Sequence, residues 1–156
     1  MSTKAQIFST DFIVASSIFI ILAAVIYSLW LSRAYNIEEN NQLSNLIDSA
    51  YLSSNVWLRE GTPEYWDKEN IIDLGLQNNH RLNKTKIEML DDFGYERVKD
   101  LAGLSDYDFF MRIYNKGNQT LFEFGKMGEA RNIIKVKRVS ILDGEIVFID
   151  TIVWSR

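Results

Sequence analysis

The longest apolar run in the chain extends from Phe12 to Leu31. It contains no charged residue, no Gly and no Pro, and three serines are its only polar side chains. Roughly 20 helical residues at ~1.5 Å each match the ~30 Å hydrocarbon core of a bilayer. A helix pairs all of its backbone polar groups internally, as lipid requires. The run therefore predicts a membrane-inserted helix. A buried core helix of a soluble protein fits poorly, because the remaining chain is too small to surround it.

The apolar pattern then changes to a single stripe with steps of three and four residues. No Gly or Pro separates this stripe from the apolar run, so we predict one long helix from about residue 10 to 58. Its first half would lie in lipid and its second half on a folded domain. A break at residues 36–41, where helix propensity is low, is the alternative. Gly61 and Pro63 are expected to end the helix. The stripe consists of Leu43, Leu46, Ile47, Ala50, Ser54 and Trp57.

Two short helices are predicted next. Asn83 is typical of an N-cap and precedes a helix of about ten residues, which Gly94 closes. A second short helix follows over residues 95–101 and ends at Gly103. Together they form a small helical insert.

From Tyr107 onward the apolar period becomes two, which is typical of strands. The pair Asp143-Gly144 between two β-rich runs predicts a tight hairpin, because both turn positions favour positive φ. Both faces of the last run are apolar, so this strand is expected to be central or covered on both sides. The predicted fold class is α+β, with a long N-terminal helix packed on an antiparallel sheet of about four strands. The predicted strands are residues 107–114, 121–124, 132–142 and 145–154.

Composition narrows the function classes. The chain has 17 Lys and Arg against 21 Asp and Glu, one His and no Cys. An acidic balance argues against nucleic-acid binding, which needs clustered cations. The absence of Cys excludes disulfides and thiol chemistry. No motif for nucleophilic catalysis, phosphate binding or metal binding is present, so we expect no enzyme activity, no cofactor and no metal.

The residues in front of the apolar run suggest a family. A basic residue, a small residue and a Gln precede a short stretch with a Ser and an acid, and then the helix starts. This order resembles archaeal type IV pilin-like proteins with a class III signal peptide, although Ala5 stands where Gly is usual and Asp11 where Glu is usual. The order of motifs from Gly61 to Asp108 also resembles this group. The N-terminal roles fall on Lys4, Ala5, Gln6, Ser9, Asp11 and Phe12.

The resemblance implies a role for each of these positions. A prepilin peptidase would cleave near Ala5 and Gln6, where Lys4 marks the leader, and Phe12 would open the assembly helix. Asp11 would pair with the terminal amine of a neighbouring subunit. Alternatively, Asp11 caps the helix N-terminus, where its carboxylate satisfies free N–H groups. Both roles are compatible.

The resemblance also implies a domain layout and a location. Residues 1–6 are a leader-like segment, residues 7–32 a transmembrane and filament-core helix, and residues 33–156 an extracellular pilin-like domain. The implied function is a structural subunit, major or minor, of an archaeal type IV pilus-like surface filament. Its partners would be the membrane, other pilin-like subunits and prepilin peptidase. The alternative is a single-pass membrane-anchored extracellular binding domain that never polymerises.

Other candidate sites are individually weak. Asn83 and Asn118 each begin an Asn-x-Thr glycosylation triplet, which matters only outside the cell. His80 is expected in an exposed loop, and Trp66 is expected to be a core or lid aromatic rather than a platform for a ligand. The acidic pairs Asp91-Asp92 and Asp106/Asp108 are interpreted as solvated loop residues rather than a cation site. Three basic residues on one strand are interpreted as protection against edge aggregation; these are Lys135, Lys137 and Arg138.

Overall fold

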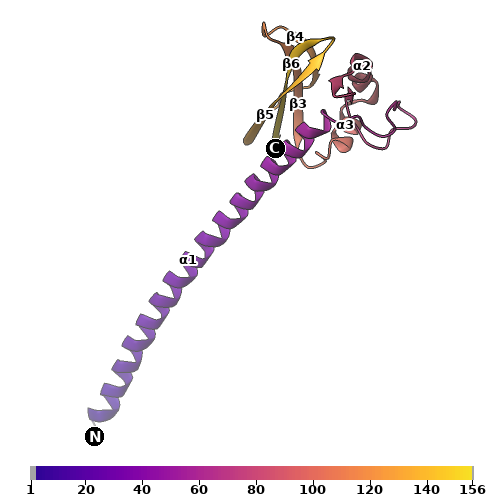
Figure 1. Cartoon of the computed structure of the whole chain (residues 1–156). Helices are drawn as coiled ribbons and strands as arrows, with labels where there is room; N and C mark the ends of the chain where they lie inside the picture. Colours follow the sequence, from indigo (N-terminus) through magenta and orange to yellow (C-terminus); the bar gives the residue numbers. More distant parts are fainter. Residues whose placement is uncertain (1–2, 156) are drawn as a thin grey trace. The chain divides into compact units, whose positions relative to one another are not determined.

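The computed structural model describes residues 3–155, and the side chains of residues 10–35 and 37–155. The chain divides after Gln42 into two compact units. We call residues 43–155 the head domain. Figure 1 shows the elements in chain order: α1 (Thr3–Val56), β1 (Gln77–Asn78), β2 (Arg81–Leu82), α2 (Lys84–Phe93), α3 (Tyr95–Leu101), β3 (Asp108–Asn115), β4 (Thr120–Gly125), β5 (Asn132–Leu142) and β6 (Glu145–Ser155).

The long helix is confirmed as one element. α1 contains 54 residues and continues without interruption through residues 36–41, so the alternative of a break there is wrong. Within its apolar half, Ser17 Oγ donates a hydrogen bond to the carbonyl oxygen of Ile13 at 2.8 Å. This bond to the preceding turn allows a hydroxyl to lie in an apolar segment.

The C-terminal turns of α1 form the base of the head domain core. Leu46, Ala50 and Trp57 are almost completely buried there. Trp57 stacks on Phe109, and its indole Nε1 donates a hydrogen bond to Thr151 Oγ1 at 3.0 Å. The helix ends at Val56 rather than at the predicted residue 58. The chain tightens there into turns in which Leu58 N–H bonds to the carbonyl of Asn55, and this tightening directs the Trp57 ring into the core.

The helical insert is confirmed with the expected cap. Asn83 has extended backbone angles, and its Oδ1 accepts hydrogen bonds from the backbone N–H groups of Thr85 (2.9 Å) and Lys86 (3.3 Å). These bonds satisfy donors that the first helical turn leaves free. Gly94 separates α2 from α3 with a φ of 75°, a left-handed conformation that Gly adopts without strain.

The antiparallel sheet has the strand order β4-β3-β6-β5, with β6 paired on both sides, so its predicted central position is confirmed. The Asp143-Gly144 hairpin is also confirmed, with φ values of 51° and 84°. The predicted bounds of β5 match those observed. Those of the other strands are within one residue at each end.

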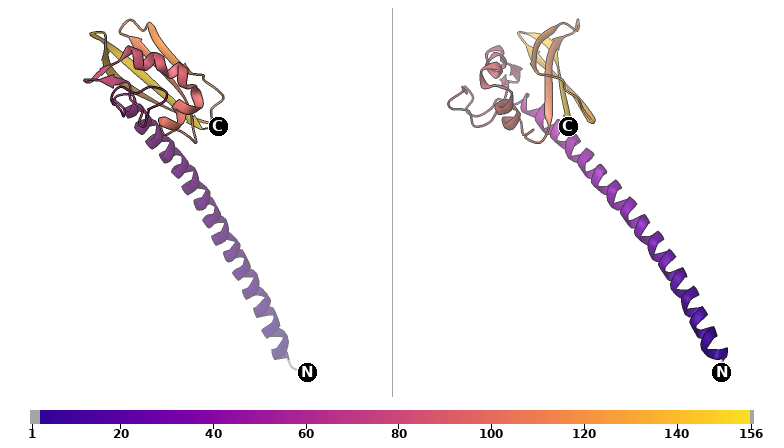
Figure 2. Two further views of the ribbon diagram at one scale, coloured as in Figure 1. Left: turned by 90° about the vertical axis from the view of Figure 1, so that its right-hand side faces the viewer. Right: turned by 180° about the vertical axis from the view of Figure 1, so that it is seen from behind.

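Within the head domain, α2, α3 and the C-terminal turns of α1 lie on one face of this sheet (Figure 2). Val147, Ile149 and Val153 of β6 point to the helical face and are buried. Phe148 and Ile152 alternate with them on the opposite face, which we call the outer face, and are only half-buried. The expectation that β6 is covered on both sides by other elements is therefore wrong for the described residues. Contacts among the strands' own side chains shield the outer face instead.

A buried lysine organises the segment between α1 and α2. Lys86 is 3% exposed, and its Nζ donates hydrogen bonds to the carbonyl oxygens of Glu60 (2.5 Å) and Gln77 (3.0 Å). Burial lowers the pKa of Lys86, and the carboxylates of Glu60 and Glu64 oppose this shift. The ammonium group thus joins the segment that follows α1 to strand β1.

Trp66 is a core residue, as predicted. It is 2% exposed, and its Nε1 donates a hydrogen bond to the Gly75 carbonyl at 2.9 Å. The short β1–β2 hairpin follows Gly75. Its turn contains Asn79 and His80, both with positive φ.

Tyr95 joins α3 to the start of β3. The backbone N–H of Phe109 donates a hydrogen bond to the Tyr95 hydroxyl oxygen at 2.8 Å, and the hydroxyl lies 3.3 Å from Asp108 Oδ1. The Tyr95 ring also stacks on Phe109. Burial raises the pKa of Tyr95, and the neighbouring carboxylates contribute to the rise.

We expect Asn83→Ala to lower the free energy of unfolding by about 1 kcal/mol, because two backbone donors lose their acceptor. Thr85→Ala is the matched control. It also destroys the glycosylation triplet but keeps the cap, so unglycosylated Thr85→Ala protein should stay within about 0.5 kcal/mol of wild type. Urea unfolding of both variants in mild detergent measures the difference. Equal stabilities of the two variants would disprove the capping role.

The raised pKa of Tyr95 predicts a pH-dependent contribution to stability. As pH rises through about 10, the unfolded state loses this proton before the folded state does, so the contribution decreases. We expect Tyr95→Phe to cost about 1–2 kcal/mol at pH 8 through its lost hydrogen bonds. The difference in free energy of unfolding between wild type and Tyr95→Phe should be smaller at pH 10.5 than at pH 8. A gap in the free energy of unfolding that is constant between the two pH values would contradict this account.

Candidate assembly surface on helix α1

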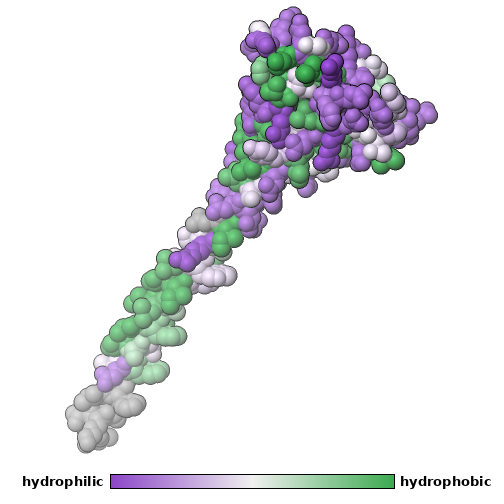
Figure 3. Space-filling view, viewed as in Figure 1, coloured by the Kyte–Doolittle hydropathy of each residue, from purple (hydrophilic) through white to green (hydrophobic). Residues whose placement is uncertain are grey.

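The N-terminal half of α1 exposes apolar side chains on all sides. Every large apolar residue from Phe12 to Trp30 exposes more than half of its surface, up to 72% at Phe19. No residue of the most apolar stretch is buried, so this stretch is not a core helix within the described chain. Figure 3 shows the resulting hydrophobic band along the helix. Such a continuous apolar surface indicates a site of contact with lipid or other proteins.

One side of this apolar surface is shaped so that another helix could pack against it. A shallow groove follows the helix with steps of three and four residues, and the small side chain of Ala23 lies among larger ones. Tyr27 and Trp30 stack at its C-terminal end with ring centroids 6.3 Å apart. Large and small side chains in alternation allow another helix to pack closely. The groove is lined by Phe19, Leu22, Ala23, Ile26, Tyr27 and Trp30.

Asp11 lies at the edge of the apolar surface with its side chain exposed. The described helix begins at Thr3, so Asp11 is inside α1 and does not occupy its N-cap position. The capping role predicted for Asp11 is therefore wrong for the full-length chain, because the helix starts earlier. Phe12 follows with 71% of its surface exposed. The side chains of Lys4, Ala5 and Gln6 lie outside the described part of the structure.

By length and composition, α1 is the one helix in the described part of the chain that is suited to cross a membrane. Its apolar stretch from Phe12 to Leu31 corresponds to ~30 Å of helix. Such a span leaves no backbone group unpaired in lipid, and its exposed side chains are compatible with a hydrocarbon solvent.

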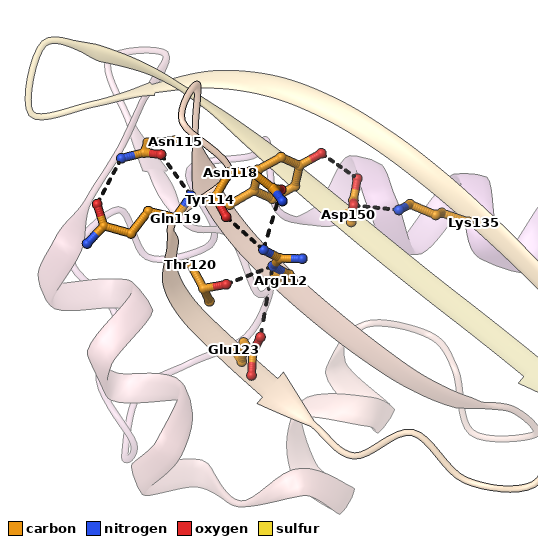
Figure 4. Close-up of polar contacts among 9 residues, drawn as sticks. All are labelled: Arg112, Tyr114, Asn115, Asn118, Gln119, Thr120, Glu123, Lys135 and Asp150. Atoms are coloured by element: carbon orange, nitrogen blue, oxygen red, sulfur yellow. Dashed lines mark hydrogen bonds and ion pairs between the residues drawn. The ribbon is translucent and has the colours of Figure 1, made fainter.

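The outer face of the sheet carries a polar network (Figure 4). Arg112 donates hydrogen bonds to Thr120 Oγ1 (2.9 Å) and to the carbonyl of Asn118 (3.1 Å), and its guanidinium lies over the Tyr114 ring. The Arg112 side chain therefore stabilises the β3–β4 turn. It also lies 3.9 Å from Glu123.

The predicted basic row on β5 is divided between the two faces of the sheet. Lys135 lies on the outer face and binds the buried Asp150 carboxylate at 2.6 Å, and Lys137 lies over the Tyr114 and Phe148 rings. Arg138 points to the helical face, where its Nε donates a hydrogen bond to Ser54 Oγ. The three cations do not form one patch, because successive strand residues point to opposite faces. β5 is nevertheless an edge strand, as expected.

The acidic pairs do not gather into a metal site among the described residues. Asp91, Asp92 and Asp106 are exposed, as expected. Asp108 is different: it is 8% exposed and lies 3.5 Å from the ammonium group of Lys99. The interpretation of Asp108 as a solvated loop residue is therefore wrong. Lys99 precedes Asp108 by nine residues and lies in a different element, so no periodic pattern in the sequence indicates that the two side chains pair.

The two glycosylation triplets occupy different environments. Asn83 uses its amide oxygen as the cap of α2, whereas Asn118 lies exposed in the β3–β4 turn with a φ of 61°. An exposed turn is the kind of position that a glycosylating enzyme can reach. Whether either residue is modified stays a prediction.

Comparison of the chain with models of protein families, with curated proteins and with solved structures finds no match in any of the three. The pilin-like resemblance therefore remains a hypothesis that rests on the residues themselves.

Proposed function

We propose that this protein is a structural subunit of a type IV pilus-like surface filament of the archaeal kind, major or minor, and that it assembles through the N-terminal half of α1. The observation that carries the proposal is the continuity of α1. Residues 12–30 present apolar side chains that the described chain leaves uncovered, and the same helix continues into the head domain core. A helix that is apolar at one end and packed into a domain core at the other suits a subunit that bundles its helices.

The physical basis is the burial of apolar surface. Before assembly, lipid would surround residues 12–31, and in a filament the helices of neighbouring subunits would replace the lipid. Transfer between two apolar environments costs little, so close packing of side chains decides whether helices associate. The groove around Ala23 offers a position where a neighbouring helix packs closely.

Asp11 would supply specificity in this assembly. A carboxylate at the edge of an apolar helix is costly unless it has a partner. After removal of the leader, the new terminal amine of a neighbouring subunit would be that partner. The pair would set the axial position of one subunit against the next, because a shift would leave both charges unpaired in an apolar surrounding.

The second candidate function is a single-pass membrane-anchored binding domain without polymerisation. The same exposed apolar helix supports it, because an anchor also needs ~20 apolar residues. The two functions make different demands on Asp11. Filament assembly would require its carboxylate, whereas a membrane anchor would not.

We expect Asp11→Asn to reduce filament yield at least about hundredfold, because breaking a buried charge pair costs about 3–5 kcal/mol. Asp48→Asn is the matched control, since Asp48 is an exposed carboxylate on the same helix within the head domain. Its filaments should be undiminished. The measurement is the quantity of this chain in sheared surface filaments, with circular dichroism to verify folding. Normal assembly of Asp11→Asn would favour the anchor function.

Coexpression with an archaeal prepilin peptidase should shorten the chain by roughly the first five or six residues. Ala5→Leu is expected to block cleavage, because the processing site implied by the resemblance has a small residue there. Intact-mass measurement reads out both results. A full-length mass after coexpression, with a control prepilin cleaved in the same cells, would contradict the predicted leader.

A further inference from the structure

The head domain contains a cavity of about 940 Å³ beside the start of β3. Its wall is built from the junction of α2 and α3, the C-terminal end of β4, the loop that follows β4, and the end of β6. None of these elements belongs to the apolar half of α1. The cavity is therefore separate from the proposed assembly surface. Its lining includes four carboxylates, one ammonium group, several apolar side chains and one indole N–H group.

Carboxylates outnumber cations on the cavity wall. Four carboxylates line it, from Asp91, Asp108, Glu123 and Glu129, against the single ammonium group of Lys126. Asp108 and Glu123 have cationic neighbours that do not line the cavity, Lys99 and Arg112. Asp91 and Glu129 are exposed and have no ion pair within the described residues. Such a wall attracts a cation and repels an anion.

Trp154 supplies an unused hydrogen-bond donor to this cavity. It is 2% exposed, yet its indole Nε1 makes no hydrogen bond within the described chain. The other two buried tryptophans of the head domain both donate one: Trp57 to Thr151, and Trp66 to the carbonyl of Gly75.

The Trp154 N–H group points into the cavity. Every fully buried side-chain nitrogen or oxygen among the described residues has a partner, so Nε1 of Trp154 must reach open space. It lies on the cavity wall beside Gly128, 3.9 Å from the position that a Cβ atom there would take. The N–H group therefore has no partner in the described part of the protein and opens to the cavity, where an acceptor on a ligand would bind it.

The remaining wall is apolar. Phe124 is buried, Met127 is half exposed, and the Tyr95 ring packs against Phe109 and Phe124, which also contact each other. An apolar wall with a few convergent polar groups is the usual composition of a site for a small organic ligand.

We propose that this cavity binds an organic cation in which a primary ammonium or guanidinium group and a hydrogen-bond acceptor are joined by an apolar stem. The cation pairs with the carboxylates, the acceptor takes the Trp154 N–H, and the stem packs on Phe124 and Met127. A free amine of this form and a Lys or Arg residue of a peptide share this chemistry.

The test uses the full-length ¹⁵N-labelled protein in detergent micelles. The chain has four tryptophans, so four indole N–H signals are expected, and Trp154→Phe identifies that of Trp154 by its loss. The probe is N-acetyl-L-arginine amide, and N-acetyl-L-citrulline amide is its uncharged counterpart of equal shape. We expect the arginine compound to shift the Trp154 signal saturably and to bind at least about tenfold more tightly than the citrulline compound.

A variant pair tests the carboxylates. Asp91→Asn combined with Glu129→Gln should weaken binding of the arginine compound at least about fivefold, because both side chains are exposed and lack another ion pair. Glu88→Gln, also on α2 but outside the cavity lining, should bind like wild type. No saturable shift, equal affinity for both compounds, or undiminished binding by the double variant would each overturn the proposal.

The same titration distinguishes the two sources of the ligand. A blocked Ala-Arg-Ala tripeptide that binds more tightly than N-acetyl-L-arginine amide supports a peptide as the natural ligand. Weaker binding of the tripeptide supports a free amine. Both results support the shared chemistry.

Discussion

One constraint governs this structure: no other part of the described chain covers the apolar N-terminal half of its longest helix. From Phe12 to Trp30 the large apolar side chains are all more than half exposed. Leaving such a surface in water costs roughly 25 cal/mol for each Å² of apolar area, so its transfer to another apolar phase is favourable. Lipid and neighbouring helices are the two phases that suit a helix of this length and composition.

The head domain is built to hold the other end of this helix. Trp57 enters the core directly after α1 ends, stacks on Phe109 and donates its N–H to Thr151 of the central strand. The helix is therefore joined to the sheet by packing and by a hydrogen bond, as well as by the backbone.

Local signals in the sequence predicted most of these elements. Contacts between residues that are distant in the sequence could not be predicted in this way. The Asp143-Gly144 turn and the Asn83 cap depend on neighbouring residues, and both were correct. The ion pair of Lys99 with Asp108 and the two carbonyl bonds of Lys86 join segments with no shared period. The cavity beside Trp154 gathers residues from five elements and a loop, so no single stretch indicates it. The short β1–β2 hairpin was also missed, although Asn79-His80 is a turn signal.

The most direct test of the account is the location of the native protein after cells are broken and their membranes are washed with alkaline carbonate. The account predicts that the chain remains in the membrane pellet or in sheared surface filaments, and that only detergent releases it from the membrane. Recovery of the chain in the supernatant as a freely soluble monomer with Met1 still attached would contradict the account, because residues 12–30 would then face water.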